Sequence, residues 1–450
     1  MMLVDLPRRW RVVLGGALLA VVVLLLVFVV VGRERSRPAA VVAAPFVLPL
    51  PAALISLDTA PARGAPAVAA QATAEPAQAG EVQMCGGHWL RTNADGSPIE
   101  YPDLRSPQFP QARKRLADLL RADQREVAQA AAIWVAMIDA DRRRAAAAKA
   151  LAPASDAADA AAACAAPLCP IAGAQDSEVD ALLDQLARLA LSARDPAVYA
   201  IAFNTCHQRS IGACALLSAE QWTRVDPGNG MPWMHVLAEA RERRDAQAEA
   251  EALYQVSVAK RFDTREFAIP GLIATIGSVA PEDEAGTVAV FELAIETFGM
   301  AAAWTMPSYQ HVTQACRADT LRDANRRQTC EGIATTLGER SDTVLPAMLG
   351  LSIGRRLDWP VERVARQRGV YEAYATSSTQ ETDTAEQALS CGAMRRTLAR
   401  LERQGEIGEV AYMRQWAKAS GKPPEEFERI GRASIARREA DAASAPRPQS

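Results

Sequence analysis

Apolar residues recur at helical spacing along most of the chain beyond residue 110. Between Leu116 and Met137 they follow one another at three- and four-residue steps, as on the buried stripe of an amphipathic helix. The segment 179–190 repeats this pattern, and no segment alternates apolar and polar residues as a half-buried strand does. Further helices are predicted at 301–317, 324–338, 342–355, 360–376, 382–403, 406–420 and 424–438. The pattern therefore predicts an all-α domain of antiparallel helices.

Capping residues support several of these helices. Asp195 precedes Pro196, which places a side-chain acceptor before a proline at the first helical position. Ser177 with Asp180 three residues later is close to a capping box. Pro281 is followed by three acidic residues, whose charge favours the positive end of a helix dipole. Helices are thus expected to begin near 177, 196 and 281.

A continuous apolar run occupies the N-terminal segment, where residues 12–31 carry no charge. At about 1.5 Å per residue, a helix of this length spans the hydrocarbon core of a bilayer. A cleaved signal peptide has a shorter apolar region, of roughly 7–15 residues, and ends at small residues. This run instead ends in Gly-Arg-Glu-Arg at 32–35. The sequence predicts an uncleaved transmembrane anchor at 12–32, after a short flank at 1–11.

Proline and alanine dominate the segment that follows the anchor. Proline lacks a backbone donor and breaks helices, so residues 33–84 are predicted to form a partly extended tether. The apolar part at 41–57 could also lie on the membrane surface. The all-α domain is expected at 85–438, and the Ala-, Ser- and Pro-rich residues 439–450 are expected to form a disordered tail.

Composition and charge narrow the class of protein. The 450 residues are 49% hydrophobic and 23% charged, which excludes a fully disordered chain. The net charge of −3 argues against a nucleic-acid partner, since such proteins are basic. The preference for arginine over lysine and the alanine richness suggest a GC-rich bacterial source. A bacterial inner-membrane protein with a single span is therefore expected, although the arginines on both sides of the anchor do not fix its orientation.

Eight cysteines all follow the predicted anchor. An even number confined to the downstream part suits disulfides in an oxidising compartment. The alternative is a cytosolic domain with buried free thiols. Disulfides are favoured, and the C-terminal domain is then periplasmic.

The segment 222–262 carries the most specific pattern of the domain. The residues that define this pattern are Trp222, Asp226, Pro227, Gly228, Asn229, Trp233, Leu237, Ala238, Ala250 and Tyr254. In this order they resemble tetratricopeptide-type repeats and, more loosely, Sel1-like repeats, over about residues 205–262. Trp233 and Leu237 are four residues apart where the family has three, and the closing proline is absent. Two interpretations stay open: a solenoid of repeats, or one helical hairpin in an irregular α-domain.

Cysteine spacing is compatible with helical hairpins. On one helix, Cys206 and Cys214 would lie about 12 Å apart, whereas a disulfide needs less than about 7 Å. Either they do not pair, or the chain turns at 210–212. The run from Cys206 to Leu217 also resembles the stapled hairpins of Sel1-like proteins. The hypothetical pairs are Cys206–Cys214, Cys164–Cys169, Cys316–Cys330 and Cys85–Cys391, among the 105 connectivities that eight cysteines allow.

No catalytic, cofactor or metal site is predicted. His88, His207, His235 and His311 form no paired metal spacing, and Cys85-Gly-Gly-His88 has no second half. The sequence has no CxxC, GxSxG, GxGxxG or Walker A motif.

These observations favour a membrane-anchored periplasmic helical-repeat protein that binds or scaffolds a protein or peptide. Trp233 and Tyr254 are candidates for a groove between helices, although core packing is the stronger interpretation for Trp233. Two alternatives remain: an enzyme whose site is assembled from scattered carboxylates and arginines, and a purely structural envelope protein.

Overall fold

The computed structural model describes residues 81–83, 85, 89–91, 108–151, 177–207, 211–279, 284–304, 307–380 and 390–444. The predicted anchor, Cys164 and Cys169 lie outside these ranges, as does the predicted tether except for residues 81–83. Within the described ranges, no helix has the length and apolar character needed to cross a membrane.

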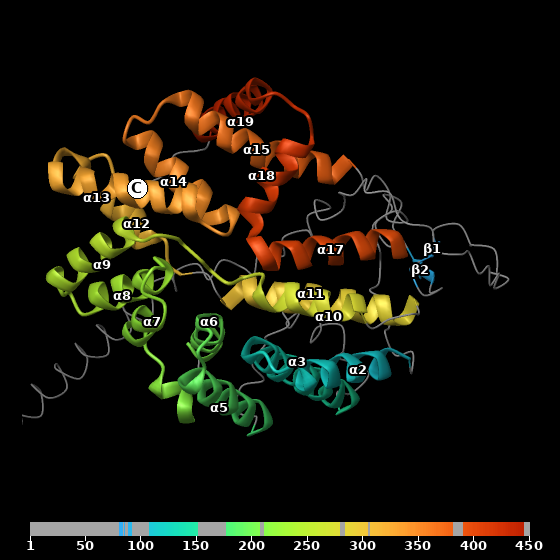
Figure 1. The fold of residues 1–450 in the computed structure, drawn as a ribbon. Helices are drawn as coiled ribbons and strands as arrows, with labels where there is room; N and C mark the ends of the chain where they lie inside the picture. Colours follow the sequence, from blue (N-terminus) through green and yellow to red (C-terminus); the bar gives the residue numbers. More distant parts are fainter. Residues whose placement is uncertain are drawn as a thin grey trace, which may run out of the picture. The chain divides into compact units, whose positions relative to one another are not determined.

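Helices make up nearly all of the described chain (Figure 1). The first group is α2 (Gln108–Ala122), α3 (Glu126–Leu151), α5 (Ser177–Ser192), α6 (Pro196–Cys206), α7 (Ala219–Val225), α8 (Met231–Glu242) and α9 (Ala246–Val258). The second group is α10 (Ala268–Val279), α11 (Glu284–Trp304), α12 (Gln310–Ala315), α13 (Ala324–Arg340), α14 (Val344–Arg356), α15 (Val361–Gln380), α17 (Cys391–Ile407), α18 (Glu409–Ala419) and α19 (Pro424–Ser444). Two 3-10 turns, η2 (Gly212–Leu216) and η3 (Thr320–Arg322), complete the helical elements.

The all-α prediction is confirmed, with one small exception. Strands β1 (Glu81–Gln83) and β2 (Trp89–Arg91) pair antiparallel, with Val82 opposite Leu90. Three residues per strand are too few to show an alternating pattern in the sequence.

Two helix boundaries differ from the sequence-based expectation. The single helix expected at 301–317 is divided between the end of α11 and α12, with Pro307 between them. Proline removes a backbone donor and disfavours helical backbone in the preceding residue, so one continuous helix cannot form there. At the other end of the domain, α19 continues to Ser444, beyond the expected start of the tail at 439.

Side-chain caps fix the beginnings of several helices. Asp195 accepts a hydrogen bond from Ala197 N at 2.9 Å and is followed by the predicted proline at the start of α6. Asp245 caps α9 through Ala248 N at 3.0 Å, and Asp323 caps α13. Such caps satisfy backbone donors that have no partner within the helix.

One apolar cluster runs through most of the described helices. Its largest fully buried side chains include Trp134 of α3, Tyr199 of α6, Trp222 of α7 and Phe262 in the loop after α9. A smaller cluster gathers Cys85, Ala112, Val288, Ala289 and Met394. The residues of the large cluster come from nearly the whole described length, so burial of apolar surface holds these helices together as one core.

Paired glycines allow three helix pairs to approach closely. The pairs are Gly271 with Gly405 (α10 and α17), Gly338 with Gly350 (α13 and α14), and Gly369 with Gly431 (α15 and α19). A Cβ atom on Gly271 would lie 2.7 Å from Gly405 Cα, which is closer than van der Waals contact. Gly354 likewise lies against the ring of Trp359.

Three disulfides lie within the described residues, and they are three of the four hypothesised pairs. Their Cα–Cα distances are 4.6 Å for Cys85–Cys391, 5.4 Å for Cys206–Cys214 and 5.7 Å for Cys316–Cys330. The chain does turn between Cys206 and Cys214, where Gly212 has a φ of +45° and η2 begins. Cys85–Cys391 bridges 306 residues and joins the start of the domain to α17.

Replacing Cys316 and Cys330 together by serine is expected to lower the free energy of unfolding by about 3 kcal/mol, because their disulfide closes a loop of roughly 15 residues. Urea denaturation of the variant and the parent would measure the difference. A double-serine variant as stable as the oxidised parent would show that this disulfide contributes nothing.

Candidate functional site

The loops that join successive helices lie side by side at one place in the domain. Asn229, after α7, forms a parallel bridge with Arg261, after α9, and Phe262 forms a parallel bridge with Ser341, after α13. Val410 N of α18 donates to Asp342 O at 3.0 Å. Ionisable side chains from segments far apart in the sequence are thereby brought together.

The Asp-Pro-Gly-Asn turn supplies a structural anchor for these loops. Asn229 is fully buried, and its amide nitrogen donates to Asp226 Oδ2 at 3.1 Å and to Asp263 O at 2.9 Å. Its amide oxygen accepts from Met231 N at 3.0 Å and from Asp263 N at 2.9 Å. With all four hydrogen bonds satisfied, this asparagine fixes the loop geometry and has no free capacity for a ligand.

Among the carboxylates that these loops bring together, Asp342 accepts the most hydrogen bonds. Its Oδ2 accepts from Thr264 N at 2.9 Å, from Thr264 Oγ1 at 3.0 Å and from Arg265 N at 3.1 Å. Burial and the neighbouring Asp263 carboxylate raise the pKa of Asp342 well above its ordinary value. Asp263 in turn forms an ion pair with Arg265 at 3.0 Å. A second arginine, Arg261, lies 3.4 Å from the same Asp263 oxygen, so the two carboxyl groups lie together with two arginines beside Asp263.

A second pair of carboxyl groups lies next to the first. Burial raises the pKa of Glu266 to about 8, and the nearby Glu409 adds to the increase. Burial also raises the pKa of Glu409, opposed by the hydrogen bond that its Oε2 accepts from Val344 N at 2.8 Å. The pKa of Tyr309 is raised by burial and by the charges of Asp342 and Glu266. At neutral pH, Glu266 is therefore mainly protonated.

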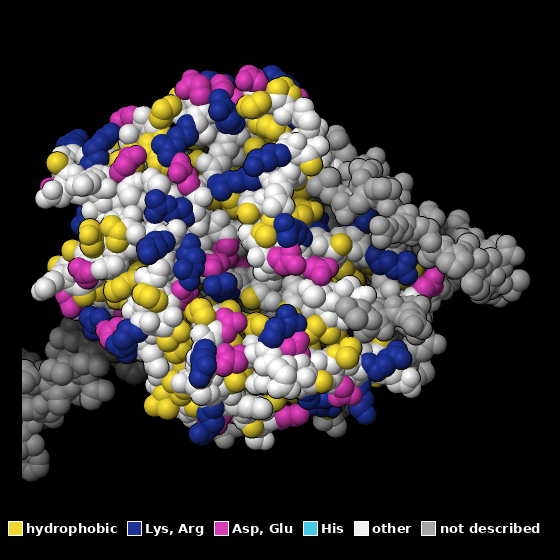
Figure 2. Space-filling view, in the orientation of Figure 1, with side chains coloured by type: hydrophobic (Ala, Val, Ile, Leu, Met, Phe, Trp, Pro, Cys, Tyr) yellow, Lys and Arg dark blue, Asp and Glu magenta, His cyan; other side chains and the backbone are white. Residues whose placement is uncertain are grey.

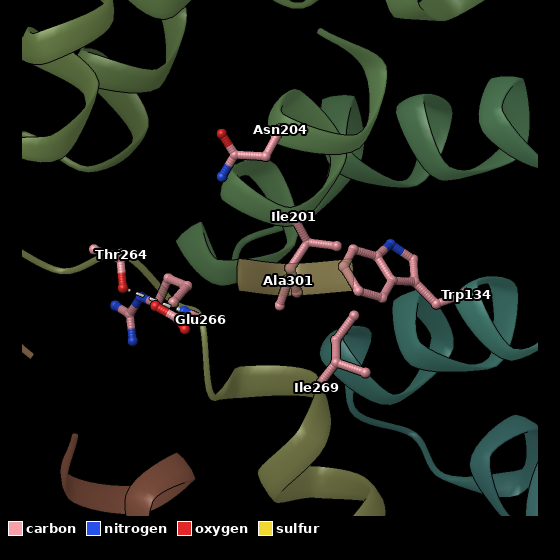
Figure 3. A pocket seen from close by; sticks show the side chains of 8 residues that line it. Trp134, Ile201, Asn204, Thr264, Glu266, Ile269 and Ala301 are labelled. Carbon is pink, nitrogen blue, oxygen red and sulfur yellow. Dashed lines mark hydrogen bonds between the residues drawn. The ribbon is translucent and has the colours of Figure 1, made fainter. Parts of the chain in front are cut away.

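A narrow pocket adjoins the residues 264–266 (Figure 3). Trp134, Ile201, Ile269 and Ala301 form its apolar wall, and Asn204 projects from α6. The volume that water can occupy is about 10 Å³, enough for about one water molecule. The pocket can hold a small polar group but has no space for a large ligand.

Trp233 and Tyr254, the predicted groove residues on α8 and α9, differ in exposure. Trp233 is half-buried against the main core, whereas the Tyr254 side chain is 53% exposed. Ala250 also faces solvent, and the buried residues of α9 are Ala252, Leu253 and Val256. The core-facing side of α9 is thus formed by Ala252, Leu253 and Val256.

The histidines of the described residues are not arranged as a metal site. Burial, together with His207, lowers the pKa of His235 to about 3, so its ring stays neutral. His235 packs against Phe203 and Trp222, with ring centroids 5.0 and 5.7 Å apart. In the described ranges no group of three or more histidine, cysteine, aspartate or glutamate side chains is placed to hold a metal ion.

Sequence reasoning missed the carboxylate cluster that is formed by Asp263, Glu266, Asp342 and Glu409. Its available signal was the repeated Asp-Thr dipeptide at 263–264 and at 342–343, each a few residues before a helix. Either dipeptide alone is typical of a helix cap. Only the pairing of the two loops reveals that the two aspartates meet.

Comparisons with protein-family models, with curated proteins and with solved structures find no match for this chain. The resemblance to tetratricopeptide-type and Sel1-like repeats therefore stays a prediction.

Replacing Asp342 by alanine is expected to lower the free energy of unfolding by about 2–3 kcal/mol, because three buried donors lose their acceptor. Asp342→Asn keeps an acceptor oxygen and removes the repulsion from Asp263, so its stability should stay within about 1 kcal/mol of the parent. Chemical denaturation at pH 7 measures both variants. Equal losses in the two would mean that the charge of Asp342, and not its accepted hydrogen bonds, stabilises the loops.

Proposed function

We propose that this chain is a membrane-anchored periplasmic protein of the bacterial envelope whose helical hairpins bind a protein or peptide. The proposal rests on the side-by-side arrangement of the loops between helices. The loops at 226–230, 259–267 and 341–343 lie side by side, and α9 packs against α13, which supports a stacked arrangement of the hairpins α8–α9 and α13–α14. Stacked helical hairpins offer extended surfaces that suit macromolecular partners.

Helix α9 offers the apolar part of such a surface. Tyr254 and Val258 lie one turn apart on it, and their side chains are 53% and 49% exposed. Figure 2 shows apolar side chains lying among acidic and basic ones, with neither sign of charge dominating this face. An exposed tyrosine beside an aliphatic residue is a typical anchor of a protein interface, since aromatic residues contribute much of the binding energy.

Affinity capture from detergent-solubilised membranes with the full chain tests the binding function. The parent should recover a stoichiometric partner, and Tyr254→Ala combined with Val258→Ser should lose it. Val361→Ser is a matched control, because Val361 is 53% exposed at the start of α15. A partner lost equally from the control, or none recovered by the parent, contradicts the proposal.

Cellular location requires a separate experiment. A membrane-impermeant thiol reagent added to intact cells should label the cysteines only after reduction, because the domain is proposed to lie in the periplasm with its disulfides formed. Thiols that stay shielded in intact cells and react after lysis without reductant would place the domain in the cytoplasm.

A second candidate function, that of an enzyme, is favoured by the carboxylate cluster. Asp263, Glu266, Asp342 and Glu409 converge from two loops and the start of α18, and the pKa values of three of them are raised, as is common for catalytic acids. Any substrate would have to reach Glu266, which is half-buried. A hydrolytic activity of the purified chain that Glu266→Gln abolishes without loss of stability would support this candidate.

A further inference from the structure

We propose that the Cys85–Cys391 disulfide is a site of thiol–disulfide exchange, at which a protein dithiol releases strands β1 and β2 from α17. The inference goes beyond the proposed binding function and does not depend on it. Three kinds of observation support it: the burial of the bonded cysteines, their positions relative to helix ends, and the apolar cluster to which Cys85 belongs.

Accessibility distinguishes Cys391 from the other cysteines of the three described disulfides. Cys391 is only half-buried. The other five are at most 5% exposed: Cys85, Cys206, Cys214, Cys316 and Cys330. An attacking thiolate must reach one of the two sulfur atoms of a disulfide, so access limits the rate of exchange. Cys206–Cys214 and Cys316–Cys330 offer no such entry, because both cysteines of each pair are buried in the main apolar cluster.

Helix ends favour a negative charge on Cys391. It is the first residue of the 17-residue helix α17, whose N-terminus carries a partial positive charge. Cys206, by contrast, is the last residue of α6, and Cys316 directly follows α12. A helix N-terminus stabilises the thiolate that reduction produces, whereas the negative end of a helix does not. The reduced state is therefore favoured more at Cys391 than at Cys206 or Cys316.

A guanidinium group adds to this effect. Arg396 Nη1 lies 3.4 Å from the position that a Cβ atom on Gly392, the residue after Cys391, would take. Arg396 is exposed and forms no ion pair with a carboxylate of the described ranges. Its charge can thus stabilise a thiolate in the first turn of α17, since a neighbouring cation favours the charged form of a cysteine.

Cys85 has the opposite environment, which suits an uncharged thiol. It is 4% exposed and belongs to the small apolar cluster between α2, α11 and α17. Its sulfur lies 3.9 Å from Glu284 O, which can accept a weak hydrogen bond from the thiol after reduction. Because an apolar site disfavours a thiolate, this sulfur takes up a proton when the disulfide opens.

The exchange proceeds in two balanced steps. One thiolate of the dithiol attacks Cys391 Sγ and forms a mixed disulfide, while Cys85 leaves with the bonding electron pair and takes up a proton. The second thiolate of the dithiol then attacks the first sulfur of the same reductant, and Cys391 leaves as a thiolate at the start of α17. Two electrons have passed to the protein, and the dithiol has become a disulfide.

Reduction loosens one part of the domain and leaves the rest packed. Cys85 belongs to the small cluster, whereas the main apolar cluster joins most of the described helices without it. The two cysteines are 306 residues apart, so their bond fastens the start of the described chain to a late helix. Without it, β1 and β2 lose their covalent link to α17.

Graded reduction of the full chain in lipid nanodiscs tests this inference. The oxidised protein is incubated with dithiothreitol at pH 7, free thiols are alkylated at intervals, and mass spectrometry gives the reduced fraction of each disulfide. Cys85–Cys391 should be reduced at least about tenfold faster than Cys206–Cys214 and Cys316–Cys330, because only this pair has an accessible cysteine. Hydrogen exchange should then rise in β1 and β2 while α6 stays protected.

Two arginine variants separate charge from access. Arg396→Gln should lower the equilibrium constant for reduction of Cys85–Cys391 by about two- to fivefold, the size expected for one exposed charge interaction. Arg403→Gln is the matched control and should have no effect, because Arg403 lies in the same helix more than three turns beyond Cys391. Cys85→Ser combined with Cys391→Ser should raise hydrogen exchange in β1 and β2 without any reductant.

The inference is overturned if all three disulfides are reduced together, or if one of the other two is reduced first. Loss of far-UV circular dichroism together with the Cys85–Cys391 bond would also overturn it, since this disulfide would then hold the main core. Equal effects of Arg396→Gln and Arg403→Gln would contradict the stabilised thiolate at Cys391.

Discussion

Replacing Gly431 by alanine is expected to lower the free energy of unfolding by about 3 kcal/mol or more. A Cβ atom on Gly431 would overlap the carbonyl oxygen of Ala365, and one on Gly369 would overlap that of Phe427. Backbone atoms cannot rotate out of the way as a side chain can, so α15 and α19 would have to separate. Urea denaturation followed by far-UV circular dichroism measures the loss.

Gly299 provides the matched control for this substitution. It is exposed in α11, and a Cβ atom there would have no neighbour within 4 Å. Gly299→Ala should therefore stabilise the domain by about 0.5–1 kcal/mol through the higher helix propensity of alanine. Similar destabilisation by both alanines would show that the crossing of α15 and α19 does not depend on the absence of a side chain.

The stability of the domain is expected to fall as the pH rises from about 4.5 to about 8 because of Glu266. Below this window its carboxyl group is neutral in both the folded and the unfolded chain. Within the window, the unfolded chain ionises while the folded chain keeps its proton, since burial raises the folded pKa to about 8. The accumulated loss is on the order of 5 kcal/mol, and it levels off above pH 8.

Glu266→Gln isolates this contribution from every other titrating group. The difference in free energy of unfolding between this variant and the parent should grow across the pH window in favour of the variant. A difference that does not change with pH would contradict the burial of an unpaired carboxyl group at this position.

Local sequence patterns determined much of the fold of this protein. Apolar residues at three- and four-residue spacing predicted the helices, because one face of each helix must be buried. Asp195 followed by Pro196 predicted the start of α6, because a cap acts on backbone donors only a few residues away. The spacing of Cys206 and Cys214 required a turn between them if they were to pair, and the turn is present.

The sequence-based prediction was incomplete where contacts are non-local and where two local signals conflict. Tyr254 was predicted as a groove residue, but its spacing in the sequence could not give its exposure, which depends on the rotation of α9 that buries Leu253 and Val256 in the core. The helix expected at 301–317 is divided into two parts, with Pro307 between them. The prediction gave more weight to the helical spacing of apolar residues than to this proline.

The sequence by itself determined that this is an α-helical domain behind an apolar N-terminal segment, because helix periodicity and caps depend on residues close together in the chain. Only the tertiary structure decided which carboxyl groups meet. Asp263 and Asp342 are 79 residues apart, and their proximity depends on the parallel bridge between Phe262 and Ser341. The unpartnered amide of Asn204 is likewise a tertiary property, since burial and missing partners exist only after the helices have packed.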